Sequence, residues 1–169
     1  MAANDIKVIK NGYGIQEFIV EDRDTSSASY TIKPGEPTKK STNVPIILAD
    51  GEMRIGSGVF IGIATTESTE TKTVNGVVKI EMVGPGTILR GGVTTTGNMN
   101  TAAELLAVKM NCVNFDLTTV YFTIDENEAS DPNNNGLCIL DGDIDKGTVD
   151  VAVHANTTLF APIVGETMD

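Results

Sequence analysis

Apolar and polar residues alternate with a period of two along much of this chain. Val78, Ile80 and Met82 alternate with Lys79 and Glu81, and the same spacing returns over 120–125 and 149–154. Such alternation indicates strands with one buried and one solvated face. Apolar runs bounded by turn residues predict further strands at 5–9, 15–20, 29–33, 44–49, 53–55, 58–64, 87–90 and 137–140. The last of these is apolar on both faces, which is typical of a strand inside a sheet.

A single helix is predicted among these strands. Thr101 and Glu104 form a capping box, in which each side chain bonds the backbone N–H of the other residue. The helix should run from Thr101 to about Met110, with Leu105, Leu106 and Met110 on the core side. Many short strands with one helix predict a mainly β protein, built as a small β-barrel or sandwich with one short helix.

The first part of the chain differs from the rest. We divide the sequence into residues 1–43, holding an N-terminal arm and the first strands, and a body of residues 44–169. Asn11-Gly12 supplies turn chemistry between the two predicted strands of the first segment. Two interpretations stay open: an arm that packs on the body or on a partner, or simply the first strands of the same domain.

Composition limits the possible classes of protein. A chain of 169 residues forms one domain with a sizeable core. Trp is absent and aromatic residues make up 5%, so the core should consist of Val, Ile, Leu and Met. No apolar run approaches the ~20 residues of a membrane helix, and the start lacks the layout of a signal peptide. We therefore expect a soluble protein made in the cytosol, with no membrane partner.

The formal charge of −11 is unevenly distributed. Residues 1–40 carry six basic and six acidic side chains, so the whole excess lies in residues 41–169. Nucleic-acid binding depends on neutralising phosphates with Lys and Arg. An acidic body therefore predicts no direct contact with DNA or RNA.

No motif for catalysis, cofactors or metals is complete. The segment 141–147 spaces carboxylates like a calcium loop, but Lys146 and Ala152 occupy the sixth and twelfth positions, where Gly and Glu are needed. We predict a hairpin loop there, and a turn at 90–92. His154 is the only histidine and is predicted to be a plain surface residue. We therefore expect no enzyme, with no catalytic, cofactor-binding or metal residues.

The only two cysteines, Cys112 and Cys138, lie in apolar, strand-like contexts. Buried reduced thiols are the simpler prediction. A disulfide stays open, because its geometry cannot be read from the sequence.

Taken together, several of these runs resemble the head decoration, or cement, proteins of tailed bacteriophages. The resemblance covers residues 44–161 and lies in 59–66, the strand reaching Met82, 86–91, the helix start at 100–104, and 136–140 through 149–153. It is a likeness of layout and composition. It implies a β-tulip-like fold, and a homotrimer on the outer surface of a phage capsid at three-fold sites, where it stabilises the shell. The implied partner is the major capsid protein and the implied location is the virion.

Three alternatives stay open: a tail or baseplate component, a head-fibre base, and a carbohydrate-binding β-domain. The first two would usually carry repeats or a long shaft, and the third would need exposed aromatic platforms. Size-exclusion chromatography with light scattering would separate them, because a trimer, or a monomer that trimerises on capsids, favours the cement interpretation.

The charge-neutral N-terminal segment is the predicted docking element. We expect it to add as a strand to a sheet edge of the capsid protein, and expect a body lacking residues 1–20 to fold without attaching to shells. The predicted capsid-contact residues are Ile6, Val8, Ile9, Tyr13, Ile15 and Phe18.

Overall fold

The structure, a computed structural model, describes residues 6–20, 30–41, 44–47, 59–71, 73–118, 121–127 and 135–154. The strands are β1 (Lys7–Lys10), β2 (Ile15–Val20), β3 (Tyr30–Ile32), β4 (Pro37–Ser41), β5 (Val44–Ile47), β6 (Val59–Ala64), β7 (Ser68–Glu70), β8 (Gly76–Met82), β9 (Ile88–Gly92), β10 (Cys112–Val113), β11 (Phe115–Leu117), β12 (Phe122–Ile124), β13 (Leu137–Asp143) and β14 (Thr148–Val153). The helices are the 3-10 helix η1 (Thr96–Asn98) and α1 (Ala102–Val108).

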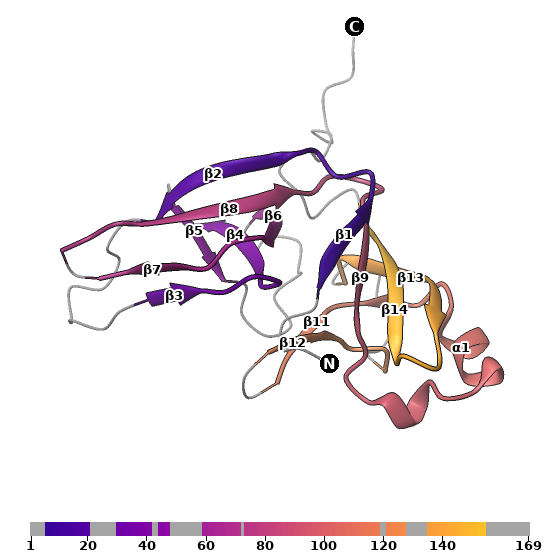
Figure 1. The fold of residues 1–169 in the computed structure, drawn as a ribbon. Helices are drawn as coiled ribbons and strands as arrows, with labels where there is room; N and C mark the ends of the chain where they lie inside the picture. The colour runs from indigo at the N-terminus through magenta and orange to yellow at the C-terminus, as the bar shows by residue number, and fades with distance from the viewer. Residues whose placement is uncertain are drawn as a thin grey trace, which may run out of the picture.

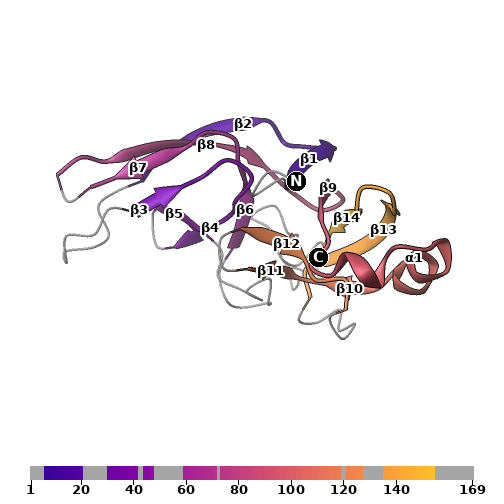
Figure 2. The same ribbon diagram turned by 60° about the horizontal axis from the view of Figure 1, so that its bottom comes forward.

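The strands form two lobes (Figure 1). In the β8 lobe, a five-stranded sheet has the order β2-β8-β6-β4-β5, and the two-stranded sheet β3-β7 extends from it. In the β14 lobe, a second five-stranded sheet has the order β1-β9-β14-β13-β10, accompanied by the pair β11-β12 and by α1. All of these strand pairs are antiparallel. Figure 2 shows the same two lobes from a second direction.

One bent ribbon connects the lobes. β1 pairs with β9 in one sheet and β2 pairs with β8 in the other, so the segments 7–20 and 76–92 run antiparallel through both. At the bend, the N–H of Tyr13 donates to Met82 O at 3.0 Å, and the Thr87 hydroxyl donates to Asn11 O at 2.9 Å. A ribbon that passes from one sheet to another makes the corner of a sandwich.

Each lobe buries its own core, and β6 contributes to both. Phe60 and Ile63 join the core of the β14 lobe, whereas Ile61 and Ala64 join that of the β8 lobe. The Phe60 ring meets Phe115 edge to face, with centroids 5.7 Å apart, an arrangement that aromatic pairs favour. β6 is therefore buried on both faces and holds the two cores together.

The predicted fold class is confirmed as mainly β and sandwich-like, with one α-helix. The sheet of the β8 lobe curls until its edge strands β2 and β5 approach each other. No ladder joins these two strands within the described residues, so the sheet is not a closed barrel.

The strands of the predicted N-terminal segment are parts of these sheets. β1 and β2 pair with β9 and β8, and β4 pairs with both β5 and β6. The described strands of this segment therefore lie in the same sheets as strands from residues 44–169. The predicted return strand at 53–55 and its Asp50-Gly51 turn lie outside the described residues.

The helix has the predicted start, but its predicted core side is wrong in part. The capping box of Thr101 and Glu104 is present. Leu105 packs against the core of the β14 lobe, whereas Leu106 is 72% exposed and Met110 is 70% exposed. Leu106 lies about 100° around the helix from Leu105, and Met110 follows the helix with a left-handed φ of 68°, so neither side chain faces the core.

Two further predictions need correction. The Arg90–Gly92 segment was predicted as a turn but is the end of β9. A side chain at Gly91 would lie 3.0 Å from Ile124, so this glycine lets a strand approach its neighbour closely. Thr123, predicted on the solvated face of its strand, is buried, and its hydroxyl is satisfied there by a hydrogen bond of 2.8 Å with that of Thr94.

Among the described parts of the chain, no helix is long and apolar enough to cross a membrane.

Candidate functional surfaces

Three of the six predicted contact residues serve the fold itself. Ile6 is only 2% exposed and belongs to the core of the β14 lobe, and Val8 packs against that core. Phe18 packs against the core of the β8 lobe. These side chains stabilise the attachment of β1 and β2 to their own sheets, and Val8 and Phe18 are only partly exposed.

The other three predicted contact residues are exposed. Ile9, Tyr13 and Ile15 all reach solvent, and Ile15 does so most, at 56%. Tyr13 stands at the bend of the ribbon, where a side chain added at Gly84 would meet its ring at 2.4 Å. Ile15 opens β2, whose first three residues are all exposed and whose Phe18 and Val20 turn towards the core.

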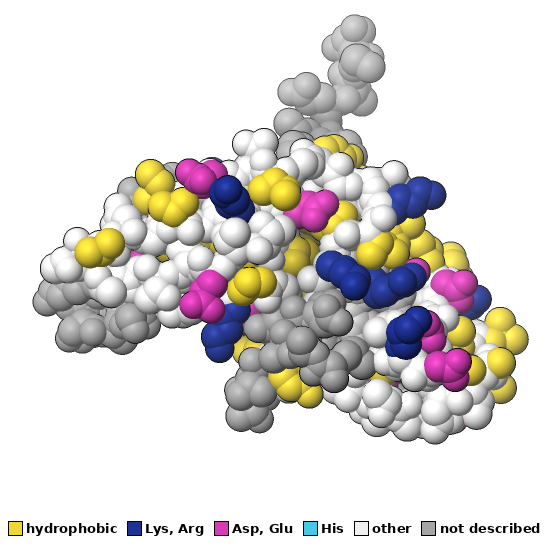
Figure 3. All heavy atoms as spheres, viewed as in Figure 1, with side chains coloured by type: hydrophobic (Ala, Val, Ile, Leu, Met, Phe, Trp, Pro, Cys, Tyr) yellow, Lys and Arg dark blue, Asp and Glu magenta, His cyan; other side chains and the backbone are white. Residues whose placement is uncertain are grey.

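Two additional residues join Ile15 on this face. Ile19 is 59% exposed and lies opposite Val77, which is 48% exposed. We call the group Ile15, Glu17, Ile19, Val77, Lys79 and Glu81 the β2–β8 outer face. Figure 3 shows apolar side chains on the β8 lobe, with single acidic and basic side chains between them.

Ile19 and Val77 were missed by the sequence analysis, although a signal was present. Ile19 follows Phe18 and precedes Val20, and Val77 precedes Val78. Strands with apolar residues on both faces are predicted to be buried on both. Here the second face is solvated, so the same pattern indicates an exposed apolar surface.

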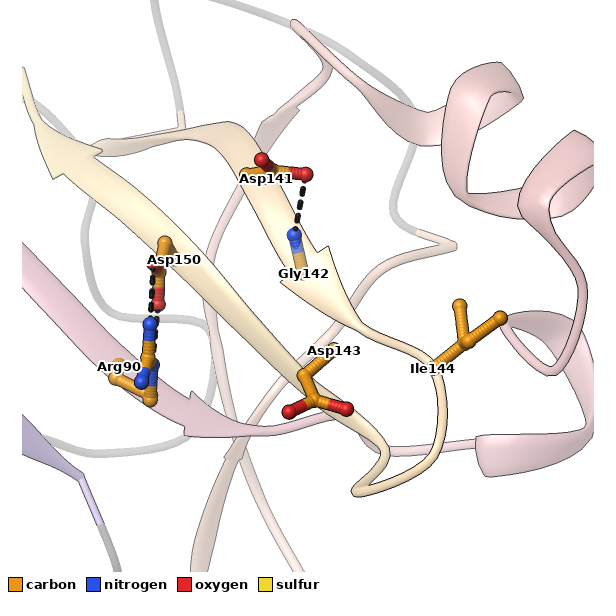
Figure 4. Close-up of a pocket in the computed structure, with 6 residues that line it drawn as sticks. All are labelled: Arg90, Asp141, Gly142, Asp143, Ile144 and Asp150. Carbon is orange, nitrogen blue, oxygen red and sulfur yellow. Dashed lines mark hydrogen bonds and ion pairs between the residues drawn. The ribbon is translucent and has the colours of Figure 1, made fainter.

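A polar hollow of about 390 Å³ lies on the β14 lobe. It is lined by Arg90, Asp141, Gly142, Asp143, Ile144 and Asp150, from β9, β13, β14 and the loop after β13 (Figure 4). β13 and β14 form the predicted hairpin around it, because they pair from Leu137–Val153 to Asp143–Thr148.

Each carboxylate in the hollow has a cationic partner. Arg90 and Asp150 lie opposite each other in register and form a two-pronged ion pair, with Nε–Oδ1 at 2.6 Å and Nη2–Oδ2 at 2.7 Å. This partner raises the pKa of Arg90. Figure 4 shows the two side chains pointing at one another across the strands.

Lysines from the surroundings neutralise the two remaining carboxylates. Lys109, just after α1, reaches Asp141 at 2.9 Å and lowers the pKa of that carboxyl. Lys146 likewise lowers the pKa of Asp143 within the hairpin. The hollow is therefore a set of exposed ion pairs that hold the hairpin, β9 and the end of α1 together.

In the described ranges, no three or more His, Cys, Asp or Glu side chains are grouped so that they could hold a metal ion. His154 follows β14 at half-buried exposure, and its backbone N–H donates to Gly136 O at 2.8 Å.

The most buried carboxylate of the β14 lobe is also bound by the fold. Glu126 is 1% exposed, and its carboxylate accepts from the N–H of Thr94 at 3.1 Å and of Thr95 at 3.2 Å. The side-chain amide of Asn127 donates a third bond at 2.8 Å. A buried carboxylate needs such donors, so Glu126 anchors the loop after β9.

No protein-family model matches the chain, and no curated protein matches its sequence.

Proposed function

We propose that this protein is a decoration, or cement, protein that binds the outer surface of a tailed-phage capsid at three-fold sites and stabilises the shell. The observation that supports this proposal best is the β2–β8 outer face. Ile15, Ile19 and Val77 are all about half exposed on one antiparallel ribbon. Apolar side chains that gather on a solvated surface are typical of interaction sites.

The outer face revises the proposed mode of docking. An arm that adds as a strand needs unpaired backbone, but β1 and β2 already pair with β9 and β8. Docking through the face leaves those ladders intact. The partner we propose is the major capsid protein, and Glu17, Lys79 and Glu81 would fix the register of the apolar contact through their charges.

A modest contact is sufficient for this role. The three apolar residues form a small patch, so one copy would bind weakly. In a trimer three such faces act together, and linked contacts raise the overall affinity by about 10²–10⁴. The acidic surface suits the outside of a shell, where a protein with 23 acidic and 12 basic residues is kept apart from packaged nucleic acid.

The test compares two exposed apolar residues in different lobes. Ile19→Glu places a charge in the β2–β8 outer face, and Leu106→Glu places the same charge on the exposed side of α1. Each purified variant is mixed with undecorated shells of a tailed phage that carries this protein, and bound protein is measured by co-sedimentation. We expect at least a tenfold loss for Ile19→Glu and near-normal binding for Leu106→Glu.

Folding and assembly are measured on the same samples. Melting temperatures close to wild type show that neither charge disrupts a core, and light scattering should give a trimer in solution or on shells. Equal binding by both variants would show that the β2–β8 outer face does not contact the shell. No binding by the wild-type protein would refute the proposed function itself. Deleting residues 1–20 is a poor test, because it removes two strands and the core residues Ile6 and Val20.

A further inference from the structure

The fold brings the only two cysteines of the chain directly opposite each other. β10 and β13 are antiparallel neighbours, with Cys112 in register with Cys138. Both residues are thiols in the structure and both are half-buried. The sequence left this pairing open, because it depends on a ladder between two strands that are far apart in the chain.

The backbone hydrogen bonds define which kind of position the pair occupies. The N–H of Ile139 donates to Asn111 O at 3.0 Å, so the backbone groups of Ile139 face β10. The N–H of His154 donates to Gly136 O at 2.8 Å, so Gly136 faces β14. The backbone N–H and C=O groups of successive residues point to opposite sides of a strand. Those of Cys138, two residues after Gly136 and one before Ile139, therefore point towards β14. The cysteine pair is therefore a non-hydrogen-bonded pair of the β10–β13 ladder.

This position suits a disulfide. In non-hydrogen-bonded pairs the Cα atoms lie about 4.5 Å apart and the side chains are closest. A disulfide needs Cα atoms about 4.4–6.8 Å apart. The register thus gives the two residues a backbone separation that a disulfide can bridge.

Both side chains also lie on the same, outer face of the sheet. Leu137 and Ile139, on either side of Cys138, are buried in the core, as is Val113 next to Cys112. Because neighbouring residues of a strand point to opposite faces, both thiols point away from the core. Burial, and then the nearby Cys112, raise the pKa of Cys138, in keeping with two thiols that interact.

We propose that Cys112 and Cys138 are a reversible oxidation site, which a small-molecule disulfide converts to a cross-strand disulfide. One cysteine thiolate attacks the small disulfide, forms a mixed disulfide and releases one small thiol. The second thiolate then attacks the protein sulfur of that bond, closes the Cys112–Cys138 bond and releases the second small thiol. The protein loses two protons and two electrons, and the small disulfide gains both.

The bond would tie an edge strand to the sheet. β10 is the last strand in the order β1-β9-β14-β13-β10, and it directly precedes β11 and β12. Closing residues 112–138 into a loop restricts the unfolded chain, so it stabilises the folded protein. The inference does not depend on the proposed docking face, which lies on the other lobe.

The test uses the full chain and oxidised glutathione as the probe. The wild-type protein is incubated with an excess of oxidised glutathione, and its thiols, its mass and its melting temperature are then measured. We expect loss of both thiols and a chain that is lighter by about 2 Da, with no bound glutathione and no disulfide to another chain. The melting temperature should rise by about 5 °C or more. Reduced glutathione should reverse all three changes.

Cys112→Ser and Cys138→Ser are the matched controls. Each retains one thiol, so each should stop at a mixed disulfide that carries one glutathione and should gain no thermal stability. The proposal would be overturned if the wild-type protein kept both thiols, retained bound glutathione on each cysteine, or formed only disulfides between chains.

Discussion

The two lobes differ most at the outer faces of their central strands. In the β8 lobe, β8 and β2 expose Ile15, Ile19 and Val77 beside three charged residues. In the β14 lobe, the equivalent face carries the Arg90–Asp150 ion pair across β9 and β14. Both lobes bury Val and Ile on their inner faces. The inner faces thus explain folding in both lobes, whereas the outer faces of these central strands differ in how they combine apolar and charged side chains.

This difference also separates two uses of charge. Across the hollow of the β14 lobe, three carboxylates each pair with a basic side chain. Such exposed pairs contribute little to stability, but they satisfy the local charges within the protein itself. On the β2–β8 outer face, the charges flank exposed apolar residues, where they can add specificity to an interface.

The largest expected effect is at β6, the strand that holds both cores. A Cβ at Gly62 would lie 2.1 Å from the backbone oxygen of Glu81, which cannot move without shifting β8. We expect Gly62→Ala to lower the free energy of unfolding by about 2–4 kcal/mol, measured by chemical denaturation. Hydrogen exchange should rise in both lobes, because β6 contributes side chains to both cores.

Gly97→Ala provides the matched control. Gly97 lies in η1, where an added Cβ meets no atom within 4 Å. We expect its free energy of unfolding to stay within about 0.5 kcal/mol of wild type. If Gly62→Ala were equally harmless, the close approach of β6 to β8 at Gly62 would not limit stability.

The second prediction distinguishes the lobes through α1, which belongs to the β14 lobe alone. The Thr101 hydroxyl accepts from the N–H of Glu104 at 3.3 Å, and the Glu104 carboxylate accepts from the N–H of Thr101 at 3.0 Å. Thr101→Ala removes the first bond, and with it the bond that the Thr101 hydroxyl donates to the Glu104 carboxylate at 3.0 Å. It should cost about 1 kcal/mol of stability. Hydrogen exchange should increase in α1 while β2 and β8 stay protected.

Thr101→Ser is the control here, because a serine hydroxyl caps the helix equally well. Thr101→Ser should keep α1 as well protected from hydrogen exchange as it is in the wild-type protein. An equal loss in both variants would mean that the methyl group of Thr101, and not its hydroxyl, stabilises the helix start.

The sequence predicted those elements whose physics is local. The alternation of Val149, Val151 and Val153 with Asp150 correctly gave β14 and its buried face. The capping box gave the start of α1, because both of its bonds lie within one helical turn. Strand pairing depends on distant residues, so the order of the sheets could not be derived from such patterns.

The candidate sites were harder to predict for the same reason. Ile6 was predicted at a contact and is a core residue, because β1 pairs with β9 from more than 70 positions away. Ile19 and Val77 form one surface only through the β2–β8 register. The opposition of Cys112 and Cys138 likewise depends on the ladder between β10 and β13.

The smallest expected effect concerns acid and the ion pairs of the β14 lobe. In the folded protein, Lys109 holds the pKa of Asp141 below the ordinary value of an aspartate. A carboxyl whose folded pKa is lowered stabilises the fold at pH values above its unfolded pKa. That contribution is lost as the pH falls through the lowered folded pKa, when the carboxyl is protonated in both states. Lys109→Met should therefore reduce stability slightly at neutral pH and not at all in strong acid.

Lys33→Met is the matched control in the β8 lobe, since it removes the same charge from another exposed position. Urea denaturation at a series of pH values from neutral to strongly acidic should show the Lys109→Met difference shrink towards zero as Asp141 is protonated. The stability difference between Lys33→Met and wild type should not shrink in the pH range where Asp141 is protonated. If the two variants gave the same pH profile, net charge alone would account for the effect. The pairing of Lys109 with Asp141 would then contribute nothing that distinguishes one lobe from the other.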